Sequence, residues 1–247
     1  LRGKVALFLI NDPDFEAKSG DGADGKFGSR RMTYYGRWSY KFDEASRRGA
    51  VAALIVHDTG GAGYGWQTVV ANNGENYDIV RGAEDTKVPL QGWIEHDAAD
   101  ALFARAGLDL NQLRAKARQS DFAPVTLGAP RFTATLEASV KRIEGRNVIA
   151  KLTGVTRPRE SLMFGAHWDA YGGAPDGTIR PGANDDALGT AGVLELARLF
   201  KAGKRPDRTL VFALWTGEER GLLGSEYYGA HPIYPLATTA ANLTLDI

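Results

Sequence analysis

The chain contains no cysteine among its 247 residues. Disulfides and thiolate metal sites are therefore excluded, and any bound metal must be held by imidazole and carboxylate groups. No apolar run approaches the roughly 20 residues that a helix needs to span a bilayer. Basic and acidic residues are balanced at 30 each, so the net charge of zero gives no indication of binding to nucleic acid or to an anionic membrane.

Neither an initiator methionine nor a signal peptide is visible at the start of the given sequence. The sequence begins with Leu1-Arg-Gly-Lys-Val5, which resembles the interior of a strand, and it ends within another apolar stretch. We therefore expect a fragment that is truncated at both ends of a longer protein. Its length is sufficient for one large domain or two modest ones.

The first 120 residues predict a small α/β module. Continuous apolar runs predict strands, and segments that end at glycine or begin at a capping residue such as Asp97 predict helices. Residues 12–36 and 60–74 have no recognisable period and are predicted to be loops. The expected strands cover residues 5–10, 50–56 and 88–94, and the expected helices cover residues 42–48, 97–105 and 110–118.

A second domain is predicted over residues 121–247, after a connection rich in proline and glycine at 121–130. Apolar strands that alternate with helices predict a mixed, mostly parallel sheet flanked by helices, and thus an α/β fold. The expected strands cover residues 131–142, 147–152, 162–166, 209–215 and 243–247, and the expected helices cover residues 186–201 and 222–228.

His167 follows the buried strand at residues 162–166 and is one of four histidines. A single histidine after a strand is most often a structural residue. Here Asp169 follows two positions later, and a carboxylate at that distance can accept the proton of the imidazole nitrogen that faces away from a metal. This spacing favours His167 as a metal ligand at the carboxyl edge of the sheet, where open α/β folds bind their ligands.

Asp185 and Asp186 lie where a glycine-rich loop meets a predicted helix. A single aspartate there is explained by helix capping. Two adjacent aspartates are not explained by capping alone, and a carboxylate held between two cations is the more specific interpretation.

Glu218 and Glu219 follow the strand at residues 209–215. Thr216 and Glu219 also fit a capping box, which on spacing alone explains this tetrapeptide. When Glu218 and Glu219 are considered together with His167 and Asp185, two different roles are favoured for them. One carboxylate would bind metal, and the other would accept a proton from water. Asp246, in the last predicted strand, is a further candidate, although a charged residue can also simply end a strand.

These segments, in this order, resemble the M28 family of zinc aminopeptidases over residues 132–247. The resemblance implies two zinc ions, with Asp185 bridging both, His167 and Asp246 completing one, and Glu219 serving the other. It also implies that Glu218 is the general base for a water between the ions, that Asp169 orients His167, and that the 185–186 peptide is cis. The matching segments are Gly165-Ala-His-Trp-Asp169, Gly182-Ala-Asn-Asp-Asp-Ala-Leu-Gly189, Thr216-Gly-Glu-Glu-Arg-Gly-Leu-Leu-Gly-Ser-Glu226 and the strand that carries Asp246.

Residues 1–120 resemble a protease-associated (PA) domain through the helix-then-strand segment at 42–56 and through Val88-Pro-Leu90. The resemblance implies an accessory module that acts as a lid or screens substrates, and an α/β packing module without substrate contact is the alternative. The family further implies a periplasmic or secreted protein that acts on peptide or protein N-termini.

The chain departs from the M28 pattern in two respects. Leu188 replaces the usual serine beside the bridging aspartate, and the family's last metal ligand, a histidine, would lie beyond residue 247. We therefore expect residues 1–247 alone to be inactive. The alternatives left open are a carboxypeptidase of acidic peptides or a glutaminyl cyclase on the same scaffold, or a non-enzymatic, receptor-like relative.

Overall fold

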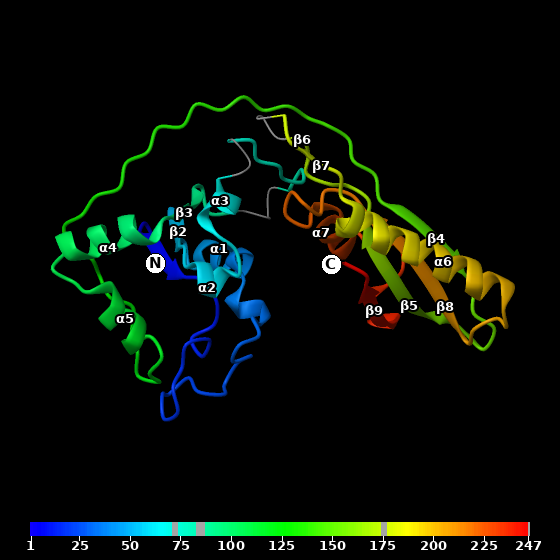
Figure 1. The fold of residues 1–247 in the computed structure, drawn as a ribbon, viewed down its shortest axis with the longest axis horizontal. Coiled ribbons are helices and arrows are strands. Elements are labelled where there is room, and N and C mark those ends of the chain that lie inside the picture. Colours follow the sequence, from blue (N-terminus) through cyan, green and yellow to red (C-terminus); the bar gives the residue numbers. More distant parts are fainter. Residues whose placement is uncertain (71–73, 83–86, 174–176, 247) are drawn as a thin grey trace. The chain divides into compact units, whose positions relative to one another are not determined.

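The computed structural model describes residues 1–70, 74–82, 87–173 and 177–246. The chain forms two compact units, shown in Figure 1, each of which is described by itself. The first comprises Leu1–Glu75 and Arg81–Glu137, and the second comprises Asn76–Val80 and Ala138–Ile247. The division thus falls later than the predicted boundary at residue 120, and a five-residue segment from the first half of the chain belongs to the second unit.

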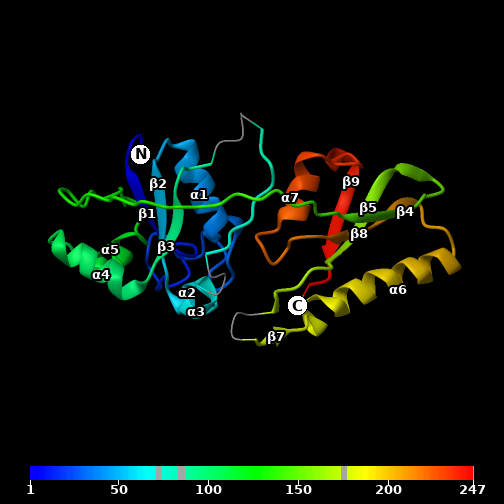
Figure 2. The same cartoon turned by 90° about the horizontal axis from the view of Figure 1, so that it is seen from above.

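The first unit is a three-layer α/β module. Strands β1 (Val5–Leu9), β2 (Ala52–Val56) and β3 (Gln91–Ile94) form a parallel sheet in the order β1-β2-β3. Figure 2 shows this sheet between α1 on one side and α4 and α5 on the other. The alternating side chains of the strands build two cores, one against α1 and one against α4 and α5. The helices are α1 (Trp38–Arg47), α4 (His96–Arg105) and α5 (Leu110–Lys116).

Three details of this unit differ from the expectations. The 60–74 region, predicted as a loop, contains two helical turns, α2 (Thr59–Ala62) and α3 (Trp66–Val69), and residues 71–73 lie outside the described part. Tyr34–Gly36, within the predicted 12–36 loop, forms a 3₁₀ turn. Asp97 is not the cap of α4, because Glu95 occupies that position and Asp97 lies in the first turn.

The strand predicted at residues 131–142 is not formed, and no helix or strand lies between α5 and β4. Its alternating apolar side chains are open to solvent, with Leu136 76% and Val140 93% exposed. Alternation alone does not make a strand, because the backbone also needs a neighbouring strand to which it can hydrogen-bond.

The second unit is built on a mixed four-stranded sheet, which confirms the predicted fold class. The strands lie in the order β4-β8-β5-β9, with β4 antiparallel to β8 and the other pairs parallel. Parallel pairing brings the carboxyl ends of β5, β8 and β9 to one edge of the sheet. The strands are β4 (Val148–Leu152), β5 (Arg157–His167), β8 (Arg208–Trp215) and β9 (Thr239–Thr244).

Both faces of this sheet are covered, which explains why its central strands β5 and β8 carry the continuous apolar runs at residues 162–166 and 210–215. Phe164 and Phe212 face α6 (Gly189–Ala202), where they pack with Val193, and Figure 1 shows α6 running along the sheet. Val211 and Trp215 point to the opposite face and pack with Tyr228 of α7 (Leu223–Ala230).

The edges of several elements differ from the predicted bounds at the positions that matter for the site. Helix α6 begins at Gly189 and not at Asp186, after the π-helical segment η2 (Ala183–Leu188). Strand β9 ends at Thr244, so Asp246 follows the strand and is not part of it, and residue 247 lies outside the described part.

The remaining elements are the short strands β6 (Gly172–Gly173) and β7 (Ile179–Arg180), which pair antiparallel, and the 3₁₀ turn η3 (Leu236–Thr238). Among the described residues, no helix is long and apolar enough to cross a membrane.

Candidate metal centre

The predicted site residues meet at the carboxyl edge of the second sheet. His167 is the last residue of β5, Glu218 and Glu219 lie in the turn after β8, and Asp246 follows β9. Asp185 comes from η2, between β5 and α6. Segments far apart in the chain thus deliver one imidazole and four carboxylates to one place, as parallel α/β sheets do at this edge.

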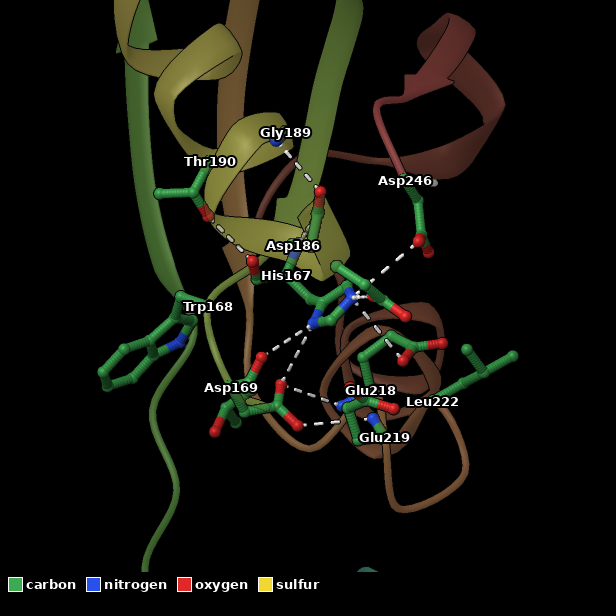
Figure 3. A network of polar contacts seen from close by, with 12 residues as sticks. His167, Trp168, Asp169, Asp186, Gly189, Thr190, Glu218, Glu219, Leu222 and Asp246 are labelled. Carbon is green, nitrogen blue, oxygen red and sulfur yellow. Dashed lines mark hydrogen bonds and ion pairs between the residues drawn. The ribbon is translucent and has the colours of Figure 1, made fainter. Parts of the chain in front are cut away.

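His167 lies at the centre of the cluster and is only 1% exposed. Its Nε2 atom is 2.9 Å from Oδ1 of Asp185, 3.7 Å from Oε2 of Glu218 and 3.8 Å from Oδ1 of Asp246 (Figure 3). Its other nitrogen, Nδ1, lies 3.1 Å from the backbone carbonyl oxygen of Asp169, to which Nδ1–H can donate. That bond fixes the tautomer in which Nε2 is available as a ligand atom.

The donor atoms fit a divalent metal such as zinc. One ligand atom each from His167, Asp185 and Asp246 lies within 4.8 Å of the other two. One imidazole nitrogen with carboxylate oxygens is a set that zinc accepts, and no thiolate is needed. Glu219 is not part of this group of three, but it lies near Asp185, whose charge raises the pKa of Glu219 in addition to the effect of burial.

The two adjacent aspartates have separate partners. Asp186 is 1% exposed, and its carboxylate accepts hydrogen bonds from the backbone N–H groups of His167 and Gly189, both at 3.0 Å. The bond to Gly189 is a capping bond to the start of α6, whereas Asp185 faces the imidazole. The capping interpretation is thus confirmed for Asp186, and a metal-binding role of Asp185 stays a prediction. The Asp185–Asp186 peptide is cis, as the family resemblance implies.

Asp169 links the loop after β5 to the turn after β8. Its carboxylate accepts hydrogen bonds from the backbone N–H of Glu218 at 3.0 Å and from that of Glu219 at 3.3 Å. The Oδ1 atom of Asp169 lies 3.7 Å from Nδ1 of His167. The contact with the imidazole therefore goes mainly through the backbone carbonyl of Asp169, and the carboxylate holds the two glutamates. The capping-box interpretation of Thr216 and Glu219 is wrong, because α7 begins only at Leu223.

The proton affinities of the cluster are shifted by its burial and its crowding. Burial raises the pKa of Glu218 to about 7 against the opposing charge of His167, and Asp246, Glu219 and Asp169 add to the rise. Burial lowers the pKa of His167, but the hydrogen bond to Asp185 and the nearby carboxylates outweigh it, so this pKa is raised. A carboxyl group that titrates near neutrality is suited to general acid–base catalysis.

A cavity of about 290 Å³ opens beside the cluster. Its lining includes Asp185 and Glu219, together with Tyr171 and Arg180, which the sequence analysis did not identify. These two lie between the His167 and Asp185 segments, in a stretch that has no hydrophobic period. Position between two site segments is the one signal that could have indicated them.

Two other residues near the segments of the site do not join the cluster. Trp168 is half-exposed and points away from the imidazole in Figure 3, and its indole N–H donates to the carbonyl of Arg146. His231, which the sequence did not favour as a ligand, stacks on Tyr227 with a ring separation of 4.4 Å at the end of α7.

Together these features define a class of protein: an α/β unit with a histidine–carboxylate cluster that could hold a metal ion at the edge of a mixed sheet. Residues 147–247 match the family model of peptidase family M28. This match confirms the predicted M28 resemblance for that part of the chain, while the PA domain of residues 1–120 and the truncation stay predictions.

Three relatives show the range of the similarity. A vacuolar membrane protease of Schizophyllum commune is 36% identical over 40% of this chain and 10% of its own length. Leupeptin-inactivating enzyme 1 of Streptomyces exfoliatus is 38% identical over 44% of this chain and 24% of its own. A probable aminopeptidase of Saccharomyces cerevisiae is 34% identical over 42% of this chain and 29% of its own length. The chain thus spans less than a third of each of these relatives.

Proposed function

We propose that the protein is a zinc-dependent metallopeptidase of the aminopeptidase type. The observation that carries the proposal is the position of His167 Nε2, which lies within 3.8 Å of carboxylate oxygens from Asp185, Glu218 and Asp246. These three residues come from separate segments of the chain, and a buried imidazole among several carboxylates is a ligand set that a divalent cation accepts. The match to peptidase family M28 supports the same reading.

The ligands are assigned from this geometry and from the family resemblance. His167 and Asp246 would hold one zinc ion, Glu219 would serve a second, and Asp185 would bridge the two. When bound, zinc would polarise the scissile carbonyl and make water a nucleophile near neutral pH. Asp169 is a positioning residue, because its carbonyl fixes the His167 tautomer and its carboxylate fixes the backbone of both glutamates.

Glu218 is assigned as the general base. Its carboxylate lies 3.7 Å from Nε2 of His167, beside the proposed ligands. In the metal-free chain burial raises its pKa to about 7, which indicates a carboxyl group poised to take up a proton. It would accept a proton from the attacking water and return it to the leaving amine. The substrates would be peptides or proteins with a free N-terminus, and a periplasmic or secreted location follows from the family resemblance alone.

The test is made on the full-length protein that contains this chain. Zinc is removed with a chelator, restored and counted by elemental analysis, and peptides with free and with acetylated N-termini are compared. We expect two zinc ions per chain, zinc-dependent cleavage of the free-amine peptides and little cleavage of the acetylated ones. Equal cleavage of both peptide series would contradict the aminopeptidase assignment, and a single zinc ion would contradict the two-metal site.

A further inference from the structure

Two arginines beside the metal centre stack on aromatic rings. The guanidinium carbon of Arg180 lies 5.3 Å from the ring centroid of Tyr171, and that of Arg220 lies 5.9 Å from the same centroid. Arg220 also lies 5.1 Å from the ring centroid of Tyr77. Tyr77, Arg220, Tyr171 and Arg180 thus form a chain of alternating rings and cations, here called the Tyr/Arg stack.

The stack borders the cavity next to the proposed metal ligands. Tyr171 and Arg180 line the 290 Å³ cavity together with Asp185 and Glu219, and Arg220 directly follows Glu219 in the chain. The short strand β7 holds Arg180 through its pairing with Gly172 of β6. Tyr171 and Arg180 of the stack therefore lie at the wall of a cavity that adjoins the proposed metal ligands Asp185 and Glu219.

Neither arginine forms an ion pair with a carboxylate among the described residues. Stacking on a ring holds the plane of a guanidinium without using its N–H donors, which remain available for a planar acceptor such as a carboxylate. Two zinc ions would balance the charges of Asp185, Glu218, Glu219 and Asp246. These four carboxylates would then no longer repel an anionic substrate group, and the two guanidinium groups would attract it.

Tyr77 reaches the stack from an unexpected part of the chain. The segment Asn76–Val80 belongs to the second compact unit, although the residues on both sides of it belong to the first. Within the segment Tyr77 and Ile79 are partly buried, whereas Asn76, Asp78 and Val80 are exposed. This alternation is that of an extended segment with one face packed, and it places Tyr77 against Arg220.

We propose that the Tyr/Arg stack is a carboxylate-binding specificity subsite, in which Arg180 and Arg220 contact a carboxylate of the peptide substrate and Tyr77 is a positioning residue that holds Arg220. The proposal rests on the metallopeptidase function proposed above. The carboxylate can be an acidic side chain near the N-terminus or the C-terminal carboxylate of a short peptide. The substrate class is therefore acidic or short peptides.

The test compares kcat/KM of the zinc-loaded, full-length protein for four matched peptides. One pair differs by glutamate against glutamine at a single position, and the other differs by a free against an amidated C-terminus. We expect at least one acidic member to be preferred about ten- to a hundredfold, since a hydrogen bond to a charged group is worth that much discrimination. The pair that shows the preference identifies the source of the carboxylate.

Variants assign the preference to the stack. Arg180→Gln and Arg220→Gln should each reduce it about tenfold or more, mainly through KM, whereas Arg159→Gln, an exposed arginine at the other end of β5, should retain it. Tyr77→Ala should weaken it and Tyr77→Phe should restore it, because phenylalanine keeps the ring face. Calorimetric binding of glutarate to the same variants gives a second readout that is independent of turnover.

The outcomes separate this proposal from the function on which it rests. No preference in the wild-type protein, or a preference unchanged in both arginine variants, would overturn the subsite while leaving cleavage of neutral peptides intact. Absence of zinc binding and of all peptidase activity would instead overturn the proposed function. A preference that survives in Tyr77→Ala would remove the positioning role of Tyr77.

Discussion

Asp185 and Asp186 are neighbours in the chain, yet their side chains have different surroundings and different chemistry. Asp186 is buried and accepts two backbone N–H groups, so it fixes the end of β5 against the start of α6. Asp185 is about half exposed and faces Nε2 of His167. A rigidly held residue beside a partly exposed proposed ligand would help to keep a metal site in one geometry.

Replacing Glu218 by glutamine tests its assignment as the base. Glutamine keeps the size of the side chain but cannot accept the proton, so zinc content should stay at the wild-type level while kcat falls about 10²–10⁴-fold. Glu144→Gln, at an exposed position outside the cluster, is the matched control and should retain activity. A Glu218→Gln protein with most of its kcat would refute the assignment.

The stability of the metal-free protein should fall between about pH 5 and pH 8. Burial raises the pKa of Glu218 to about 7 from an ordinary value of 4.5, so in this range the folded chain binds more protons than the unfolded chain. The free energy of unfolding then decreases as pH rises. The raised pKa of His167 acts with the same sign, because the stabilisation of its protonated form is lost as pH increases.

Urea unfolding of the metal-free protein at several pH values measures this dependence. Glu218→Gln carries no ionisable group at this position and should show a flatter profile than the wild-type protein across the same range. A wild-type stability that rises between pH 5 and pH 7, or identical profiles for the two proteins, would show that the burial of Glu218 does not govern this titration.

At the scale of elements, the junction between η2 and α6 depends on one close approach. A Cβ atom on Gly189 would lie 2.2 Å from Oδ1 of Asp186 and 2.2 Å from the backbone oxygen of Leu245. Glycine is therefore required where the start of α6 meets both the supporting aspartate and the segment that carries Asp246. This junction positions two proposed ligands at once.

Gly189→Ala should lower the free energy of unfolding by about 1–3 kcal/mol or more, because the extra methyl group must displace backbone atoms. Gly229→Ala is the matched control in α7, where a Cβ atom would meet nothing within 4 Å. That change should be neutral or should stabilise by up to about 1 kcal/mol, since alanine favours helix over glycine. Denaturant unfolding measures the free energy of unfolding of both variants. Equal values for Gly189→Ala and Gly229→Ala would show that the junction can relax around the added methyl group.

At the scale of the whole molecule, each compact unit has its own hydrophobic cores. Ile55 is fully buried in the first unit, and Val211 is fully buried in the second. The proposed metal ligands belong only to the second unit. Binding to the folded state stabilises it by mass action, so zinc should act on one unit and not on the other.

Calorimetry of the chain should therefore show two unfolding transitions, of which only one responds to zinc and to a chelator. At a free zinc concentration of 100 times Kd the gain is about 2.7 kcal/mol. Val211→Ala should lower the responsive transition, and Ile55→Val should lower the other. A single transition that shifts as a whole would show that the two units unfold together.

Much of the fold and the site could be predicted from local sequence. The apolar runs of β2, β5 and β8 identified the buried strands, because a strand covered on both faces needs apolar residues throughout. The spacing from His167 to Asp169 and the paired acids indicated the site, because metal chemistry restricts which side chains can serve as ligands. The roles of these residues stay predictions that the experiments above address.

Other features depended on contacts between distant segments, which no local pattern encodes. Residues 131–142 alternate like a strand but have no strand to pair with, and the carboxylate of Asp186 also accepts a hydrogen bond from the backbone N–H of His167, 19 residues earlier in the chain. The approach of Tyr77 to Arg220 joins positions 143 residues apart in the printed sequence. The sequence by itself determined the continuously apolar, buried strands and which side chains are able to bind metal. The tertiary structure decided which of those side chains meet, because that depends on how the strands pair and on how closely the backbone can approach.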